Sequence, residues 1–334
     1  MRTRALSIGV IGAGAWGTAL GCVAARNGHT VHLWSRDPER AALLNRMRTH
    51  PRLPDATLAP GVHATERRED LLGSDLILLA TPAQALRQNL QSFSDLLERP
   101  LPMVICAKGI ETTTRSFLSD IVEELMPKSE PFVLSGPAFA ADVMKNKPTA
   151  VTLAGRQLQR ATDLAAQLSL PTFRIYSSAD LLGVQLGGAV KNVLAIACGI
   201  SDGRSLGDST RAALITRAFS EMLRFGNSLG VDPLTLTGLS GLGDLVLTCS
   251  SLQSRNFSFG VALGRGEMTA AGPGEGPTIE GIPTARAVTA IAAERGLDLP
   301  ICQAVTMILA GKITIEEAID QLLSRPLRSE LVQI

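Results

Sequence analysis

A glycine-rich turn near the N-terminus decides the fold, and it reads Gly12-Ala13-Gly14-Ala15-Trp16-Gly17. An apolar run typical of a buried strand, residues 5–11, precedes the turn. A helical pattern follows at residues 15–26, and Asn27-Gly28 ends it. A G-x-G-x-x-G pattern placed between a strand and a helix is far more specific than the glycines alone.

The three glycines of the turn have separate physical roles. Gly12 permits the tight turn, Gly14 lets the backbone approach a pyrophosphate, and Gly17 allows the helix to pack close to the strand. Backbone amides at the start of the helix attract the anion. We therefore predict that Gly12, Gly14 and Gly17 form part of a dinucleotide site.

The end of the second predicted strand bears on which dinucleotide binds. The strand, residues 30–34, is followed by Ser35-Arg36-Asp37. Arg36 could pair with a 2′-phosphate and stack on adenine, which favours NADP. Asp37 could instead hold free ribose hydroxyls, so the sequence is also compatible with NAD as the cofactor.

The N-terminus also resembles a secretory signal, because Arg2 and Arg4 precede an uncharged stretch, residues 5–25. A signal core needs an unbroken apolar helix, whereas five glycines interrupt this one: Gly9, Gly12, Gly14, Gly17 and Gly21. We expect a cytoplasmic protein without an integral membrane segment.

Composition narrows the possible partners and folds. The chain has 334 residues, and at about 150 residues per domain this length predicts two domains. It is 45% hydrophobic and its net charge is +1, so no basic field is available to bind nucleic acid. The five cysteines show no CxxC spacing, which predicts neither a disulfide framework nor a structural zinc or other metal site.

The secondary-structure pattern of the sequence changes near residue 180. Before it, helical patterns alternate with short apolar runs at residues 30–34, 75–80, 103–107, 132–135, 150–153 and 173–176. This alternation predicts an α/β fold, a Rossmann-type domain with a mainly parallel sheet, over residues 1–182. Long helical patterns at residues 181–200 and 209–229 then indicate a C-terminal all-helical domain over residues 183–334.

Several polar segments follow predicted strands. They are Thr81-Pro82, Lys108-Gly109 and Ser135-Gly136-Pro137-Ala138-Phe139-Ala140. Ligands of open α/β sheets bind outside the carboxyl ends of the strands, so we expect these segments to converge on one cleft. The ammonium of Lys108 could meet a phosphate or a carbonyl there.

Lysine is the expected acid–base residue. All four histidines lie within the first 63 residues, so a site built from later segments needs another group. Lys191 interrupts an apolar helical pattern just after Gly187-Gly188. Burial lowers the pKa of a lysine, as a proton donor near neutral pH requires. Glycines inside a helix suggest a close approach of backbone or ligand.

Two later segments supply further polar groups. Gly241-Leu242-Gly243-Asp244-Leu245 offers a carboxylate that could orient Lys191 or accept a substrate hydroxyl. Ser254-Arg255-Asn256 precedes a helix predicted at residues 257–263. A hydroxyl, a guanidinium, an amide and free helix amides together suit a phosphate.

Taken together, these segments resemble the bacterial NAD(P)-dependent glycerol-3-phosphate dehydrogenases. The resemblance runs from residue 8 to about residue 325 in the family's order. Its matching runs are Ile11-Gly12-Ala13-Gly14-Ala15-Trp16-Gly17-Thr18-Ala19-Leu20, Lys108-Gly109, Ser135-Gly136-Pro137, Gly183-Val184-Gln185-Leu186-Gly187-Gly188-Ala189-Val190-Lys191-Asn192-Val193, Gly241-Leu242-Gly243-Asp244-Leu245, Gln253-Ser254-Arg255-Asn256 and Glu280-Gly281.

The resemblance implies reversible reduction of dihydroxyacetone phosphate to sn-glycerol 3-phosphate, a precursor of phospholipids. It makes Lys191 the proton donor, with Asp244 and Lys108 as further catalytic residues. The implied substrate contacts are Lys108, Gly136, Ala138, Lys191, Asp244, Ser254, Arg255 and Asn256. The implied cofactor contacts, beside the glycines, are Ala15, Trp16, Arg36, Lys108, Ala140, Arg255, Thr278 and Glu280.

Two positions depart from the family pattern. Ala138 stands where serine or threonine is usual, and Ala15 stands where serine is frequent. Each therefore offers only a backbone amide. Both changes bear on affinity rather than on the type of reaction.

The sequence is also compatible with two other functions. A β-hydroxyacid dehydrogenase also pairs a Rossmann domain with a helix-borne lysine before an asparagine, but its substrates carry a carboxylate. A non-catalytic NADP-sensing protein would keep the glycine turn without needing Lys108, Lys191 and Asp244 together. The partner in each case is a small molecule, and the helical domain could form a homodimer.

Overall fold

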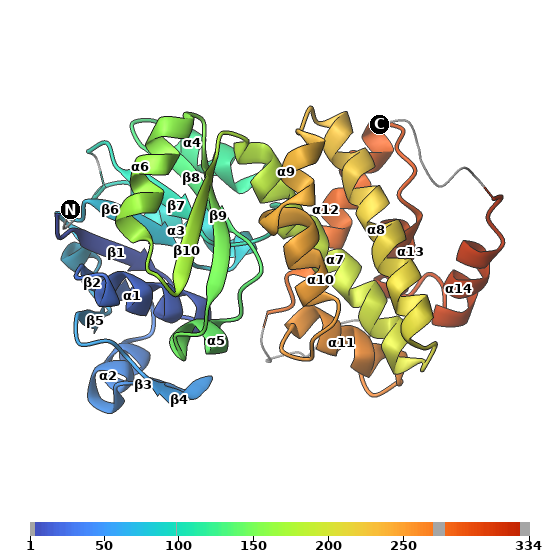
Figure 1. Cartoon of the computed structure of the whole chain (residues 1–334), viewed down its shortest axis with the longest axis horizontal. Helices are drawn as coiled ribbons and strands as arrows, with labels where there is room; N and C mark the ends of the chain where they lie inside the picture. Colours follow the sequence, from blue (N-terminus) through green and yellow to red (C-terminus); the bar gives the residue numbers. More distant parts are fainter. Residues whose placement is uncertain (1–3, 98, 270–277, 328–334) are drawn as a thin grey trace. The chain divides into compact units, whose positions relative to one another are not determined.

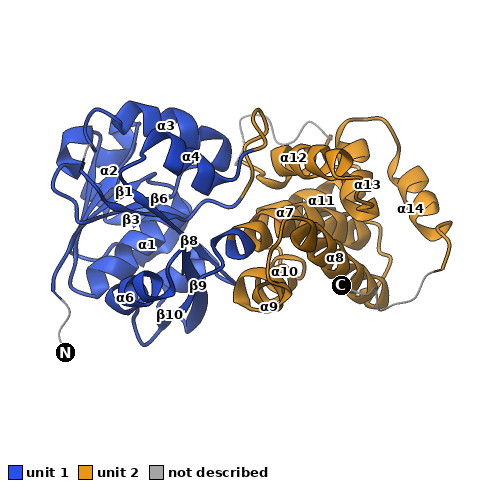
Figure 2. Cartoon of the chain, turned by 90° about the horizontal axis from the view of Figure 1, so that it is seen from above, with its two compact units in different colours: residues 1–108, 116–184 blue, residues 109–115, 185–334 orange. Residues whose placement is uncertain are grey.

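The computed structural model describes residues 4–97, 99–269 and 278–327. The chain divides into two compact units (Figure 2). Unit 1 comprises residues 1–108 and 116–184, and unit 2 comprises residues 109–115 and 185–334. Unit 1 is built on a β-sheet, whereas the described part of unit 2 contains helices and no strand (Figure 1). The predicted fold class is confirmed.

The sheet of unit 1 has eight strands. Their order across the sheet is β10 (Phe173–Ser178), β9 (Thr149–Gly155), β8 (Glu130–Ser135), β7 (Pro102–Ile105), β6 (Leu76–Leu79), β1 (Ser7–Ile11), β2 (Thr30–Trp34) and β5 (Val62–Thr65). Among these described strands only β8 and β9 pair antiparallel, so the sheet is mainly parallel, as predicted.

Helices cover both faces of the sheet. Alternate strand residues point to opposite sides, so apolar side chains on both faces are available to pack against helices. Ile8 and Val10 pack with α1 (Ala15–Arg26) and α6 (Leu158–Leu168) in one buried cluster (Figure 1). Ile11 packs in a second cluster with α3 (Leu86–Phe93) and α4 (Leu118–Leu125). The shorter elements of unit 1 are α2 (Pro38–Met47), α5 (Ala140–Met144), η1 (Arg68–Leu71), η2 (Ala83–Ala85) and a hairpin of β3 (Thr49–His50) and β4 (Leu53–Thr57).

Unit 2 is assembled around a long apolar helix, α7 (Leu181–Gly203), which begins in unit 1. The helices that follow are α8 (Asp208–Ser228), α9 (Pro233–Thr237), the π-helical turn η3 (Leu239–Gly243), α10 (Asp244–Thr248), α11 (Arg255–Gly264), α12 (Gly281–Glu294), α13 (Pro300–Leu309) and α14 (Ile315–Leu323). By length and composition α7 alone among the described helices could cross a membrane, but 89% of its most apolar window is buried inside the protein. That burial is typical of a core helix.

Glycines allow α7 and α11 to cross with their backbones in contact. A Cβ atom on Gly199 would lie 2.1 Å from the carbonyl oxygen of Phe257, and one on Gly260 would lie 2.3 Å from that of Ile196. Backbone atoms cannot turn aside as a flexible side chain can. The crossing therefore requires glycine, and it places the start of α11 beside the middle of α7.

We expect Gly260→Ala to destabilise the protein by roughly 3 kcal/mol, because the added methyl group forces the two helices apart. Gly21→Ala in α1 is the matched control. The nearest neighbour of a Cβ atom added there is a Val31 methyl group at 3.3 Å, which can move. Chemical denaturation followed by far-UV circular dichroism measures both. Equal stabilities of the two variants would contradict the account of the crossing.

Candidate active site

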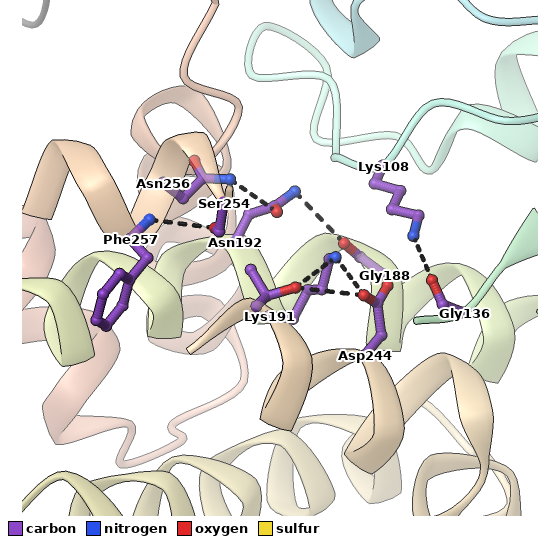
Figure 3. Close-up of polar contacts among 10 residues, drawn as sticks. Lys108, Gly136, Gly188, Lys191, Asn192, Asp244, Ser254, Asn256 and Phe257 are labelled. Carbon is purple, nitrogen blue, oxygen red and sulfur yellow. Dashed lines mark hydrogen bonds and ion pairs between the residues drawn. The ribbon is translucent and has the colours of Figure 1, made fainter. Parts of the chain in front are cut away.

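The predicted lysine lies on α7 and is held by two partners from α10 (Figure 3). The Nζ atom of Lys191 donates to Oδ1 of Asp244 at 2.5 Å and to Oγ1 of Thr248 at 2.8 Å. Lys191 is 7% exposed, Asp244 0% and Thr248 2%. In such a desolvated setting the carboxylate compensates the ammonium for its lost hydration and fixes its position.

Local helix geometry explains why these groups meet. Gly187 and Lys191 are four residues apart on α7, so they share one face of the helix. A Cβ atom on Gly187 would lie 2.6 Å from the carbonyl oxygen of Ser240, inside the π-helical turn η3. Of the two predicted partners of this glycine, backbone or ligand, the structure shows backbone. This close approach brings η3, and with it Asp244 as the first residue of α10, against α7.

A chain of amide hydrogen bonds joins three helices next to the lysine. The side chain of Asn256 in α11 donates to Oδ1 of Asn192 at 2.9 Å, and Asn192 donates to the carbonyl oxygen of Gly188 at 3.4 Å (Figure 3). Oδ1 of Asn256 accepts the backbone N–H of Gly281, the first residue of α12, at 2.9 Å. Both asparagines are buried, so they tie α11 and α12 to α7 beside Lys191.

The segment predicted to bind phosphate forms the N-terminus of α11. Oγ of Ser254 accepts the backbone N–H of Phe257 at 3.2 Å and so caps the helix. For this reason the helix begins at Arg255, two residues before the predicted start. Arg255 is exposed, and Ser254 and Asn256 are buried.

Lys108 and Gly136 come together in unit 1, as expected for residues that follow neighbouring strands. Nζ of Lys108 donates to the carbonyl oxygen of Gly136 at 3.0 Å (Figure 3). Gly136 has a φ of 148°, and a Cβ atom there would lie 2.8 Å from Cα of Val151, so glycine is required. Ala138 and Ala140 follow it, both half-buried.

The glycine turn has the geometry of a dinucleotide cradle. Gly12 has a φ of 118°, and a Cβ atom on it would lie 2.8 Å from the backbone of Ala80. A Cβ atom on Gly17 would lie 2.1 Å from the carbonyl oxygen of Gly12, whereas Gly14 faces open space within 4 Å. The predicted roles of the three glycines agree with these distances.

At the same edge of the sheet lie buried polar atoms that find no hydrogen-bond partner among the residues that the structure describes. They include Nε1 of Trp16, in the first turn of α1, and the hydroxyl oxygens of Thr81, which follows β6, and Ser135, which ends β8. The first turn of α1 carries no acidic residue and no side-chain cap. Buried groups of this kind need hydrogen-bond partners, and a phosphate-bearing dinucleotide can supply them. The residues present therefore fit such a cofactor.

The two candidates for cofactor selection have different surroundings. Oδ1 of Asp37 accepts the backbone N–H groups of Glu39 and Arg40 at 3.0 and 3.4 Å, so the carboxylate caps α2. Arg36, two residues after the end of β2, is exposed. This arrangement favours Arg36 as the group that faces a ribose phosphate. The remaining predicted cofactor residues, Arg255, Thr278 and Glu280, belong to unit 2.

Two neighbours of Lys191 escaped the sequence analysis as site residues. Thr248 follows Asp244 by four residues, the spacing that places two side chains on one helical face, and this signal could have revealed it. Cys249 is the next residue. Burial raises the pKa of the Cys249 thiol well above its usual range, and the nearby Cys198 thiol adds to the effect, so no thiolate competes with the lysine.

Comparison with known proteins agrees with this architecture. Residues 7–161 match the family profile for the NAD-dependent glycerol-3-phosphate dehydrogenase N-terminus, and residues 180–320 match the one for its C-terminus. The glycerol-3-phosphate dehydrogenase [NAD(P)+] of Bradyrhizobium diazoefficiens is 50% identical over 97% of this chain and 98% of its own length. The enzyme of that name from Methylobacterium radiotolerans is 51% identical over the same shares.

A solved structure shows the same fold. The glycerol-3-phosphate dehydrogenase of Coxiella burnetii superimposes with a TM-score of 0.91 at 38% identity, covering 96% of this chain and 99% of that one. Both halves of the chain match the family's own two profiles, and the matches extend over nearly its whole length. The chain therefore belongs to the NAD-dependent glycerol-3-phosphate dehydrogenase family.

Proposed function

We propose that this chain reversibly reduces dihydroxyacetone phosphate to sn-glycerol 3-phosphate with NAD(P)H and so supplies phospholipid synthesis. The observation that carries the proposal is the buried ammonium of Lys191, held by Asp244 and Thr248 in a family whose relatives bear this enzyme's name. The proposal includes a cytoplasmic location. It also includes a homodimer formed through apolar side chains of unit 2 such as Leu234, which is 75% exposed.

Reduction of a ketone requires a proton at the oxygen as negative charge develops there. Lys191 donates this proton from Nζ and accepts it back in the reverse direction. Asp244 and Thr248 each accept a hydrogen bond from Nζ and so orient the ammonium. When bound, the reduced nicotinamide supplies the hydride.

The other predicted residues bind and orient. In the proposal Arg255 and the N-terminal amides of α11 hold the phosphate of the substrate, with Ser254 and Asn256 beside them. Lys108, Gly136 and the backbone amide of Ala138 contribute from unit 1. Ala15, Trp16, Ala140, Thr278 and Glu280 contact the dinucleotide together with the glycine turn.

The test compares several substrates with each of the two cofactors. Purified protein is mixed with NADPH or NADH and either dihydroxyacetone phosphate, unphosphorylated dihydroxyacetone or a panel of keto acids, and the reduced-nicotinamide absorbance is followed. We expect turnover with the phosphate ester above the others. Turnover of keto acids alone would favour a hydroxyacid dehydrogenase, and dinucleotide binding without turnover would favour a sensing protein.

We expect Arg36→Ala to raise the KM for NADPH roughly 10- to 100-fold, the range for losing a hydrogen bond between charged groups. The KM for NADH should change much less, because NADH lacks the 2′-phosphate. Initial rates with both cofactors measure the effect, and Arg46→Ala, another exposed arginine nearby on α2, serves as control. An equal rise for both cofactors would exclude Arg36 as the selecting group.

A further inference from the structure

Asn192 follows Lys191 on α7, and the proposed reaction gives it no role. Its side chain is bonded to α11, whereas that of Lys191 is bonded to α10 (Figure 3). Asn192 is 5% exposed, and Asn256, its partner on α11, is 8% exposed. Buried amide groups need hydrogen-bond partners inside the protein, so the neighbours of this pair determine how each amide is oriented.

Two backbone groups, one at each end, orient both side-chain amides. The N–H of Gly281 can only donate, so it faces Oδ1 of Asn256, at 2.9 Å. Nδ2 of Asn256 then faces Asn192 and donates to its Oδ1 at 2.9 Å. Nδ2 of Asn192 in turn donates to the carbonyl oxygen of Gly188, one turn earlier on α7, at 3.4 Å. Each bond of this chain therefore has one possible direction.

The start of α12 packs directly against the two asparagines. A Cβ atom on Gly281 would lie 2.6 Å from the carbonyl oxygen of Asn192 and 2.9 Å from Oδ1 of Asn256. Only glycine allows this approach, which brings the N–H of Gly281 within reach of Asn256. The amide of Asn256 is thus held from α7 and from α12 at once, and it cannot rotate without breaking a hydrogen bond.

One hydrogen of the Asn256 amide takes no part in this chain. An amide nitrogen carries two hydrogens, and among the residues that the structure describes only Asn192 accepts one from Asn256. Asn256 follows Arg255 in the first turn of α11, where the proposed function places the substrate phosphate. Both hydrogens lie in the rigid plane of the amide group. The bond to Asn192 therefore sets the direction of the second hydrogen.

We propose that Asn192 is a positioning residue for the substrate phosphate: it accepts one N–H of Asn256 and thereby directs the other toward a phosphate oxygen. The inference rests on the proposed function and adds a residue that does not itself touch the substrate. Because Asn192 acts through Asn256, it contributes to the affinity for the phosphate ester and not to proton or hydride transfer.

A double-mutant cycle tests this indirect role at saturating NADPH. Asn192→Ser keeps a hydroxyl that can bond the Gly188 carbonyl, four residues earlier, but it is too short to reach Asn256. We expect it to raise the KM for dihydroxyacetone phosphate about fivefold, as for one neutral hydrogen bond, with kcat within about twofold of wild type. Asn256→Ser should raise this KM about 10- to 100-fold, the range for a hydrogen bond to a charged group. The double variant should match Asn256→Ser alone, because Asn192 has no other route to the phosphate.

An unphosphorylated substrate and an exposed asparagine provide the controls. Asn192→Ser should leave kcat/KM for unphosphorylated dihydroxyacetone unchanged. Asn227→Ser, at an exposed position of α8, should change the kinetics of neither substrate. A KM of the double variant about fivefold above that of Asn256→Ser would overturn the assignment. Such a result would mean that Asn192 touches the substrate itself or acts on the fold as a whole.

A second variant covers the case in which Asn192→Ser does not fold, as judged by thermal unfolding. Asn192→Ala removes both hydrogen bonds and should give the same KM, since the bond to Gly188 lies within α7. An unchanged KM in either variant of Asn192 would also overturn the assignment. The wild-type chain is a separate readout: absence of turnover of dihydroxyacetone phosphate there would refute the proposed function itself.

Discussion

Lys191→Met should lower kcat for dihydroxyacetone phosphate reduction about 10³-fold, within the range found for removal of a general acid. Methionine fills a similar volume but has no proton to give, so the developing alkoxide loses its donor. Asp244 keeps its contact with Thr248, at 3.3 Å between Oδ1 and Oγ1. Steady-state rates at saturating NADPH measure the effect.

The controls distinguish lost chemistry from lost structure. Lys128→Met removes an exposed lysine of unit 1 and should leave kcat unchanged. Lys191→Arg keeps the positive charge but should not restore turnover, because a guanidinium does not release its proton near neutral pH. The Kd of Lys191→Met for NADPH reports whether the dinucleotide site is intact. A kcat within tenfold of wild type would remove Lys191 from its proposed role.

The stability of Glu221→Gln relative to that of wild type should increase as the pH rises. Glu221 lies on α8 and is 1% exposed. Its Oε1 accepts the backbone N–H of Ile301 at 2.6 Å and its Oε2 that of Cys302 at 3.1 Å, so it caps the N-terminus of α13 from another helix. Burial raises the pKa of this carboxyl from 4.5 to about 7, against the opposing effect of those two N–H groups.

The sign of the pH dependence follows from this shift. The folded state binds the proton more tightly than the unfolded state, so the stabilisation is complete below pH 4.5 and is lost as the pH rises to about 7. Glutamine is neutral at every pH and lacks this loss. The stability of Glu221→Gln relative to wild type should therefore increase by roughly 2.5 kcal/mol between about pH 5 and about pH 8.

Urea denaturation at the two pH values measures this difference. Both tryptophans, Trp16 and Trp34, lie in unit 1, so far-UV circular dichroism is the suitable probe for the helices of unit 2. A relative stability that is the same at both pH values would show that the carboxyl titrates normally in the folded state.

Much of the fold follows from the sequence because its strands are short, apolar and separated by helices. The glycine turn and the change of sequence pattern near residue 180 were sufficient to predict the α/β unit, its mainly parallel sheet and the helical unit. Strand β5 (Val62–Thr65) was not predicted, because its sequence Val62-His63-Ala64-Thr65 carries too little apolar pattern to indicate a strand. Its pairing with β2, rather than its own composition, makes it a strand.

The sequence predicted which residues form the candidate site, but not which of them contact one another. Motif spacing identified Lys191 and Asp244, but they are 53 residues apart, and their ion pair depends on Gly187 admitting the π-helical turn. Tertiary contacts of this kind leave no local periodicity to read.

One isotope measurement tests the central claim most directly. The protein is supplied with dihydroxyacetone phosphate and NADPH that carries deuterium at the transferable position, and the glycerol 3-phosphate formed is analysed by NMR. We predict deuterium bound to the central carbon, with the hydroxyl proton drawn from solvent through Lys191. Glycerol 3-phosphate without deuterium at that carbon, or no such product, would contradict the account.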